Sequence, residues 1–202
     1  MEIQSNITTR KRIANLTSNI LNPFLICLAL IFLFSFISSS STPEAMKWAG
    51  ISMSASLLPV FLIIIYMMRN GSLDNFYISV RQQRTRIYLV GFLCAAGSCI
   101  ILSRMNAPQM LVYAFATGLS MVLIFTLINL WWKISIHTAL VAASATVLVL
   151  LYGWMAAASI ALVPLTAWAR VELEYHSMAQ TVSGALLAVL IVVFMFYPLA
   201  LA

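Results

Sequence analysis

The sequence predicts an all-α membrane protein, a polytopic bundle of about six or seven transmembrane helices. Hydrophobic residues make up 63% of the 202 residues, charged residues make up 8%, and the mean hydropathy is +1.01. This composition excludes a soluble domain of the same length. Backbone groups in lipid must be satisfied within the protein, and no alternating strand pattern is present in the sequence, so helices are expected.

The apolar runs predict the spans in order. A helix needs roughly 20 apolar residues to cross the hydrocarbon core. Four runs reach this length, at about 22–41, 47–68, 87–104 and 108–131. The stretch Ile136–Trp168 is too long for one span and is interrupted by Tyr152-Gly153-Trp154, which predicts a tight hairpin of two short spans. The run 182–202 completes a seventh span.

The amino-terminal segment 1–20 is expected to be cytoplasmic, and residues 21–202 are expected to form one transmembrane domain. The segment combines Arg10-Lys11-Arg12 with interspersed Ile and Leu, a pattern that favours a short helix along the membrane interface. The first apolar run is span-length, which favours a retained helix over a cleaved signal peptide.

Positive charge in the loops predicts the orientation, because Lys and Arg concentrate on the cytoplasmic side. With seven spans, only Lys47 and Arg104 fall on one side of the membrane. The other side carries Arg10, Lys11, Arg12, Arg69, Arg81, Arg84, Arg86, Lys133 and Arg170. The amino terminus is therefore expected in the cytoplasm. The net charge of +6 is mostly this bias, which indicates contact with anionic lipid headgroups and not with nucleic acid.

The two histidines lie in the segments that carry most of the polar chemistry. His137 lies in WWKISIHT (131–138), and His176 lies in AWARVELEYHSMAQ (167–180). In the predicted topology His137 opens the fifth span, Arg170 ends the sixth and His176 precedes the seventh, all on the cytoplasmic side. Arg neutralises phosphate oxygens while His exchanges protons near neutral pH, so these groups suit a phosphate ester. Glu172 and Glu174 are expected to face water or to pair with Arg170.

These two segments resemble the second and third signatures of the type-2 phosphatidic acid phosphatase superfamily. The second signature is Pro-Ser-Gly-His, and Ile134-Ser135-Ile136-His137 matches its Ser and His. The third is Ser-Arg, five residues, His, three residues, Asp. Ala169-Arg170, His176 and Gln180 match its Arg and His at the same spacing, but not its Ser and Asp. The resemblance covers about residues 105–202, the expected phosphatase-like core.

The resemblance implies roles for the matching residues. His176 would be the nucleophile that forms a phosphohistidine, and His137 would protonate the leaving oxygen. Arg170 and Ser135 would hold the phosphate. Gln180 stands where the family has Asp, one helical turn after His176, where it can accept a hydrogen bond from the imidazole. A neutral amide, however, does not stabilise an imidazolium by charge.

The family's first signature, Lys followed seven residues later by Arg-Pro, is absent. Arg81, Arg84 and Arg86 are the candidate substitutes, because three guanidinium groups within six residues can clamp a phosphate or diphosphate. An ordinary positive loop explains them equally well. Lys133 is expected to contribute as well, since helical spacing would put it on the same face as His137.

The leading hypothesis is a membrane-integral, metal-independent phosphatase that acts on a lipid phosphate or an isoprenyl (di)phosphate. His and Arg supply the nucleophile and the neutralising charge, so no cofactor is expected. The expected partners are this substrate and membrane lipids. The expected location is the inner membrane of a bacterial or archaeal cell, with the site on the cytoplasmic face.

Other functions stay open to different degrees. The departures from the family pattern favour, as the alternative, a non-catalytic lipid-binding or scaffolding subunit of a membrane complex. Haem ligation by the two histidines has no other supporting feature. A transporter would place an ionisable residue near the middle of a span, and none is found there. A prenyltransferase that holds magnesium on paired aspartates is excluded by the single Asp.

Overall fold

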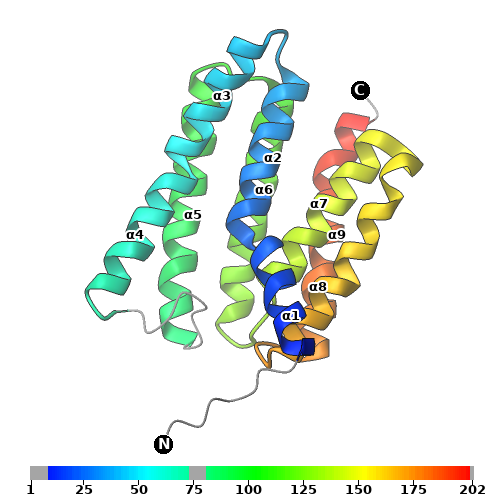
Figure 1. The fold of residues 1–202 in the computed structure, drawn as a ribbon. Coiled ribbons are helices and arrows are strands. Elements are labelled where there is room, and N and C mark those ends of the chain that lie inside the picture. The colour runs from blue at the N-terminus through cyan, green and yellow to red at the C-terminus, as the bar shows by residue number, and fades with distance from the viewer. Residues whose placement is uncertain (1–8, 73–80, 201–202) are drawn as a thin grey trace, which may run out of the picture. The chain divides into compact units, whose positions relative to one another are not determined.

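The computed structural model describes residues 9–72 and 81–200, and all regular secondary structure in these residues is helical (Figure 1). Six helical segments are long and apolar enough to cross a membrane. They are Thr9–Ser38, Thr42–Arg69, Thr85–Arg104, Gln109–Asn129, Ile136–Glu172 and Met178–Phe196. The prediction of an all-α multi-pass membrane protein is confirmed, and each expected span coincides with one of these segments or with part of one.

Several of the segments are divided into shorter helices. The elements are α1 (Thr9–Ile20), α2 (Pro23–Ser38), α3 (Thr42–Ala55), α4 (Leu57–Arg69), α5 (Arg81–Arg104), α6 (Gln109–Asn129), α7 (Ile136–Tyr152), the 3₁₀ helix η1 (Gly153–Ala161), α8 (Leu162–Glu172) and α9 (Met178–Ala200). Between α1 and α2 the chain leaves the helix and restarts it at Asn22-Pro23. Asn22 Oδ1 accepts from the Leu25 N–H at 3.0 Å, and Pro23 has no N–H to leave unsatisfied in the first turn.

The helices form two compact units. One unit contains Met1–Leu25 and Ile134–Val189, and the other contains Ile26–Lys133 and Leu190–Ala202. Two of the boundaries fall inside α2 and α9, and the third lies between α6 and α7. This division differs from the expected single transmembrane domain from residue 21, which stays a prediction. Each unit is described by itself below.

In the unit that contains α3 to α6, α5 packs against α6, and α3, α4 and α5 contact one another. The side chain of Asn129, fully buried near the end of α6, donates to Thr85 Oγ1 of α5 at 3.1 Å. In α2 and the end of α9, the rings of Phe34 and Phe196 lie 5.7 Å apart. Cys27, Cys94 and Cys99 are free thiols in α2 and α5.

In the other unit, the segment Ile136–Glu172 folds back on itself. Gly153 adopts φ +62° at the end of α7, a left-handed conformation that glycine adopts without steric cost. Both η1 and α8 then pack against α7 (Figure 1). A straight helix cannot make contacts between residues so far apart in sequence, so the predicted helical hairpin is present.

The same unit contains α1, which packs against α8. Ala14 and Ser18, one helical turn apart, are fully buried, whereas Ile13, Leu16 and Ile20 are exposed. The helix expected in the amino-terminal segment is therefore present from Thr9, with one edge docked on α8. Its other edge carries large apolar side chains outward, as a helix in contact with lipid does.

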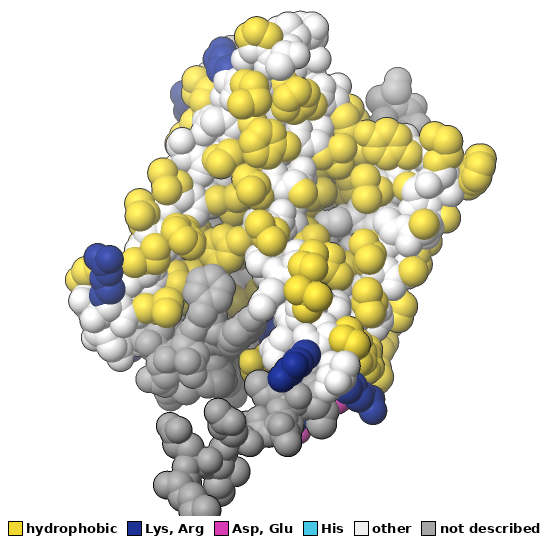
Figure 2. Space-filling view, in the orientation of Figure 1, with side chains coloured by type: hydrophobic (Ala, Val, Ile, Leu, Met, Phe, Trp, Pro, Cys, Tyr) yellow, Lys and Arg dark blue, Asp and Glu magenta, His cyan; other side chains and the backbone are white. Residues whose placement is uncertain are grey.

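Exposed apolar side chains cover most of the helix surfaces. Leu93, Leu186, Leu190 and Phe194, all well inside helices, are 61–79% exposed. In Figure 2 hydrophobic side chains cover the length of the visible helices, and the visible Lys and Arg side chains lie toward helix ends. Water would disfavour so much exposed apolar surface, whereas the hydrocarbon core accommodates it.

Candidate functional site

The first part of the site is the start of α7. Ser135 is the N-cap of this helix and is fully buried. Its Oγ accepts from the Thr138 N–H at 3.5 Å and lies 3.1 Å from Thr138 Oγ1. His137 is the second residue of the helix and is half-buried. The sequence Ser-Ile-His-Thr thus provides a capped helix start with an imidazole in its first turn.

The second part is the end of α8, where the chain makes a Schellman motif. Glu174 adopts φ +58°. The N–H groups of Glu174 and Tyr175 donate to the carbonyls of Val171 and Arg170, at 2.9 and 3.1 Å. This pattern satisfies the last carbonyls of a helix and usually has Gly at the left-handed position. The Tyr175 ring lies over the Arg170 guanidinium, with 4.5 Å from Cζ to the ring centroid.

The third part is the start of α9, where Ser177 and Gln180 form a capping box. The Gln180 N–H donates to Ser177 Oγ at 3.3 Å, and the Ser177 N–H donates to Gln180 Oε1 at 3.2 Å. This reciprocal pair satisfies two helix-terminal donors. His176 directly precedes the box, and its own N–H donates to the Arg170 carbonyl at 3.3 Å. In the turn between α8 and α9, His176 is therefore held through its backbone by Arg170 and through its ring by Gln180.

The capping box also determines which nitrogen of His176 carries a proton. His176 Nδ1 lies 3.2 Å from Gln180 Oε1. Because the Ser177 N–H donates to the same oxygen, the amide is oriented with its oxygen toward the imidazole. An amide oxygen only accepts, so Nδ1 is the donor and a neutral His176 holds its lone pair on Nε2. The expected hydrogen bond between His176 and Gln180 is present.

Helices α7 and α9 meet closely at their starts. The Ser135 N–H donates to the Gln180 carbonyl at 3.3 Å. A Cβ at Gly184, one turn further along α9, would lie 2.7 Å from the Ser135 carbonyl oxygen. Only glycine allows this approach without a shift of the backbone. The two helix amino termini, each with a partial positive charge, therefore lie together in this unit.

The fourth part is Arg170, which is 3% exposed and contacts a residue of α1 and the ring of Tyr175. Its Nη1 donates to Ser18 Oγ of α1 at 2.7 Å, across 152 residues of sequence. Its backbone carbonyl accepts from the N–H groups of Tyr175 and His176, at 3.1 and 3.3 Å. Arg170 therefore links the turn that carries His176 to the amino-terminal helix.

Two ion pairs connect the first turn of α1 with the end of α8 and the turn that follows it. Arg10 Nε lies 2.7 Å from Glu172 Oε2, and Lys11 Nζ lies 3.8 Å from Glu174 Oε1. These carboxylates were expected to face water or to pair with Arg170; Glu174 is exposed to solvent, and both carboxylates pair with basic residues of α1. The Lys11–Glu174 pair is well exposed and contributes little to stability.

The structure brings five of the predicted site residues into one unit. They are Ser135, His137, Arg170, His176 and Gln180. Ser18, Tyr175, Ser177 and Gly184 were missed by the sequence reasoning. The pattern Ser-x-x-Gln was available as a signal for the capping box, but no sequence signal connects Ser18 with Arg170.

The remaining predicted residues belong to the other unit. Lys133 was expected on the same helical face as His137, and this is wrong, because Ser135 caps α7 and Lys133 precedes the helix. Arg86 is exposed on the first turns of α5. The side chains of Arg81 and Arg84 lie outside the described part of the chain. Their predicted phosphate clamp therefore stays a prediction.

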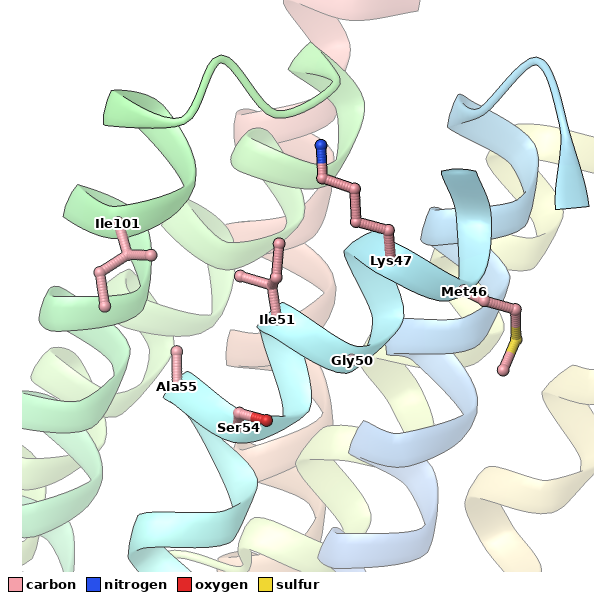
Figure 3. Close-up of a pocket in the computed structure, with 7 residues that line it drawn as sticks. All are labelled: Met46, Lys47, Gly50, Ile51, Ser54, Ala55 and Ile101. Atoms are coloured by element: carbon pink, nitrogen blue, oxygen red, sulfur yellow. The ribbon is translucent and has the colours of Figure 1, made fainter. Parts of the chain in front are cut away.

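A shallow groove of about 600 Å³ lies in this other unit, along α3 and α5 (Figure 3). Its lining is Met46, Lys47, Gly50, Ile51, Ser54, Ala55 and Ile101. The Lys47 ammonium lies 4.6 Å from the Trp48 ring centroid. The groove includes none of the predicted site residues. Among the described residues, no three His, Cys, Asp or Glu side chains are grouped to hold a metal ion.

Comparisons of the chain with models of known protein families, with curated protein sequences and with solved structures give no match.

Proposed function

We propose that the protein is a membrane-integral phosphatase that hydrolyses a lipid phosphate or an isoprenyl (di)phosphate through a phosphohistidine at His176. In this proposal the chain is a divergent member of the type-2 phosphatidic acid phosphatase superfamily. The proposal joins the signature spacing of the two histidine segments with the geometry of the turn between α8 and α9.

The observation that carries the proposal is the hydrogen bonding of His176. A histidine nucleophile must present an unprotonated nitrogen and must be held in one orientation. Gln180 Oε1 accepts a hydrogen bond from the Nδ1–H group and is itself fixed by the Ser177 N–H. Nε2 is therefore the nitrogen that would attack phosphorus.

The surrounding charges support an anionic substrate. Arg170 is buried beside the imidazole turn, and interactions of a buried cation with an anion are less screened than those at a surface. The amino termini of α7 and α9 add partial positive charge, which favours phosphate oxygens. Hydrogen bonds and charge that strengthen as the phosphoryl group is transferred lower the barrier.

In the proposed reaction, His176 Nε2 forms a bond to phosphorus while the bond from phosphorus to the leaving oxygen breaks. His137 gives a proton to that oxygen, and the lipid alcohol or lipid monophosphate departs. Water then attacks the phosphohistidine, His137 takes a proton from it, and inorganic phosphate leaves. Arg170 holds the phosphoryl oxygens throughout. Histidine and arginine supply the nucleophile and the charge, so the proposed reaction uses no metal.

An apolar substrate tail fits a chain whose helices present large apolar side chains outward. The bias of Lys and Arg to one side of the predicted topology supports a site on the cytoplasmic face. The inner membrane of a bacterial or archaeal cell remains the proposed location.

The test is phosphate release by the purified protein in detergent with EDTA, from farnesyl diphosphate, undecaprenyl diphosphate and phosphatidate. We expect wild-type release from at least one of these and none from His176→Ala. The wild type should also form an acid-labile phosphoenzyme that His176→Ala lacks. Met178→Ala, an exposed neighbour in the same turn, is the control and should keep its activity. Release that persists in His176→Ala would contradict the nucleophile.

A lipid-binding or scaffolding subunit without activity is the second candidate, and specific contacts favour it. Gln180 and Ser135 both serve as helix caps, and Arg170 already contacts Ser18 and Tyr175. These contacts give each residue a structural role without chemistry. A folded, monodisperse protein that releases no phosphate from any of the three substrates would favour this candidate.

A further inference from the structure

Ser18 is the least expected residue near the candidate site, because it comes from the amino-terminal helix. It is fully buried, and its Oγ accepts from Arg170 Nη1 at 2.7 Å. Arg170 itself is 3% exposed. The Ser18 hydroxyl is therefore in hydrogen-bonding contact with Arg170, the only buried cation among the described residues.

The hydroxyl proton of Ser18 has no acceptor among the described residues. A serine hydroxyl donates one hydrogen bond and accepts up to two. The bond from Arg170 uses an acceptor position and leaves the donor unused. Other helix hydroxyls, such as those of Thr117 and Ser144, donate to the carbonyl four residues earlier. Ser18 makes no such bond, so its hydroxyl keeps an unused donor beside Arg170.

The position of α1 is also fixed independently of Ser18. Arg10 pairs with Glu172 two turns before Ser18, and Ala14 is fully buried one turn before it. These contacts hold the edge of α1 that carries Ser18 against α8. The exposed Ile13 and Leu16 point away from this edge. The hydroxyl is therefore held beside Arg170 by the docking of the whole helix.

We propose that Ser18 is a phosphate-binding residue and that α1 forms part of the phosphatase site. Arg170 and Ser18 would together present a cation and a hydroxyl donor to the phosphoryl oxygens of the substrate. This inference rests on the proposed phosphatase function. It adds a residue from outside the histidine segments and assigns the amino-terminal helix a role in binding substrate.

The experiment measures the dissociation constant of inorganic phosphate by calorimetry in detergent, together with phosphate release from the best substrate. The variants are Ser18→Ala, Ser18→Thr and Ser18→Cys, with Thr17→Ala as the control for loss of a hydroxyl at the adjacent position. A hydrogen bond to a charged acceptor is worth about 10- to 100-fold in affinity. We expect Ser18→Ala and Ser18→Cys to lose this factor, since a thiol is a weak donor. Ser18→Thr and Thr17→Ala should stay within about threefold of wild type.

The outcomes separate this inference from the proposed function. Wild-type phosphate release with unchanged phosphate affinity in Ser18→Ala and Ser18→Cys would overturn the role of Ser18 and leave the phosphatase intact. A wild type that neither binds phosphate nor releases it would overturn both. Equal loss of affinity in Thr17→Ala would assign the effect to the packing of α1 and not to the Ser18 hydroxyl. Thermal unfolding of each variant identifies any that does not fold, and Ser18→Cys keeps the test valid if Ser18→Ala fails.

Discussion

At the scale of single residues, Gln180 is the position where a neutral amide, and not a charged carboxylate, orients the imidazole of His176. Gln180→Glu keeps the side-chain length and the capping box, because Glu serves at this position as well as Gln. Its carboxylate would accept from His176 Nδ1 with a full negative charge and stabilise the imidazolium. We expect phosphate release to rise about tenfold, the equivalent of about 1.4 kcal/mol in the barrier.

Gln180→Leu is the opposite variant, because it removes the acceptor while it fills similar space. We expect it to lose most of the activity. Equal rates in wild type, Gln180→Glu and Gln180→Leu would restrict Gln180 to a capping role.

Glu174 is a second residue with a distinct physical prediction. It holds φ +58° in the Schellman motif, where a side chain costs roughly 1 kcal/mol. Glu174→Gly should therefore stabilise the protein by about 0.5–1 kcal/mol, less the small contribution of the exposed pair with Lys11. Thermal unfolding in detergent measures this change. Glu174→Ala, which removes the pair and keeps the strain, is the matched control and should be no more stable than wild type.

The sequence predicted the residues of the site whose neighbours are local. His176 and Gln180 are only four residues apart, so contact between them was predictable, although the capping box and not a shared helix face brings them together, because His176 precedes α9. Ser18 and Arg170 are 152 residues apart, and nothing local in either segment connects them. The prediction that Lys133 shares a helix face with His137 was wrong, because α7 begins after the N-cap Ser135 and does not include Lys133.

At the scale of elements, the close approach of α7 and α9 gives the clearest prediction. A Cβ at Gly184 would meet the Ser135 carbonyl oxygen at 2.7 Å, a backbone atom that cannot rotate away. Gly184→Ala should therefore destabilise the protein by about 1–3 kcal/mol and reduce any phosphate release. Gly118→Ala in α6, where a Cβ meets nothing within 4 Å, is the control. It should be neutral or stabilising by up to about 1 kcal/mol. Equal stability of the two variants would contradict the close contact.

The helices themselves were predictable from hydropathy, but their breaks were less so. The hairpin was predicted because Tyr152-Gly153-Trp154 interrupts a long apolar run, and Gly153 indeed adopts a positive φ. The break at Ser56 between α3 and α4 was not predicted, although Pro59 was a signal for it. Proline has no N–H to donate to the carbonyl four residues earlier, here that of Ala55, and it disfavours a continuous helix at this point.

At the scale of the whole molecule, composition was sufficient to predict a multi-pass membrane protein, whereas the division into two units was not predicted. The unit with the histidines takes its helices from both ends of the chain, residues 1–25 and 134–189. Contacts such as Ser18 with Arg170 and Arg10 with Glu172 create this arrangement. Hydropathy reports how each segment meets lipid and carries no information on which segments pair.

The hairpin of α7 with η1 and α8 decides how many times the chain crosses the membrane. At 1.5 Å per residue, the 17 residues of α7 reach about 25 Å, close to the thickness of the hydrocarbon core. We expect both arms to cross it, so that the turn at Trp154 and the turn before Met178 lie on opposite sides.

The side chains of Trp154 and Met178 are well exposed, at 85% and 57%. The experiment uses a chain in which Cys27, Cys94 and Cys99 are replaced by Ala. In this chain Trp154→Cys or Met178→Cys provides a single labelling site for a membrane-impermeant thiol reagent. The positive-inside bias predicts that intact cells label position 154, and that position 178 reacts only after the membrane is permeabilised. Labelling of both positions from the same side would contradict the two crossings and make the hairpin re-entrant.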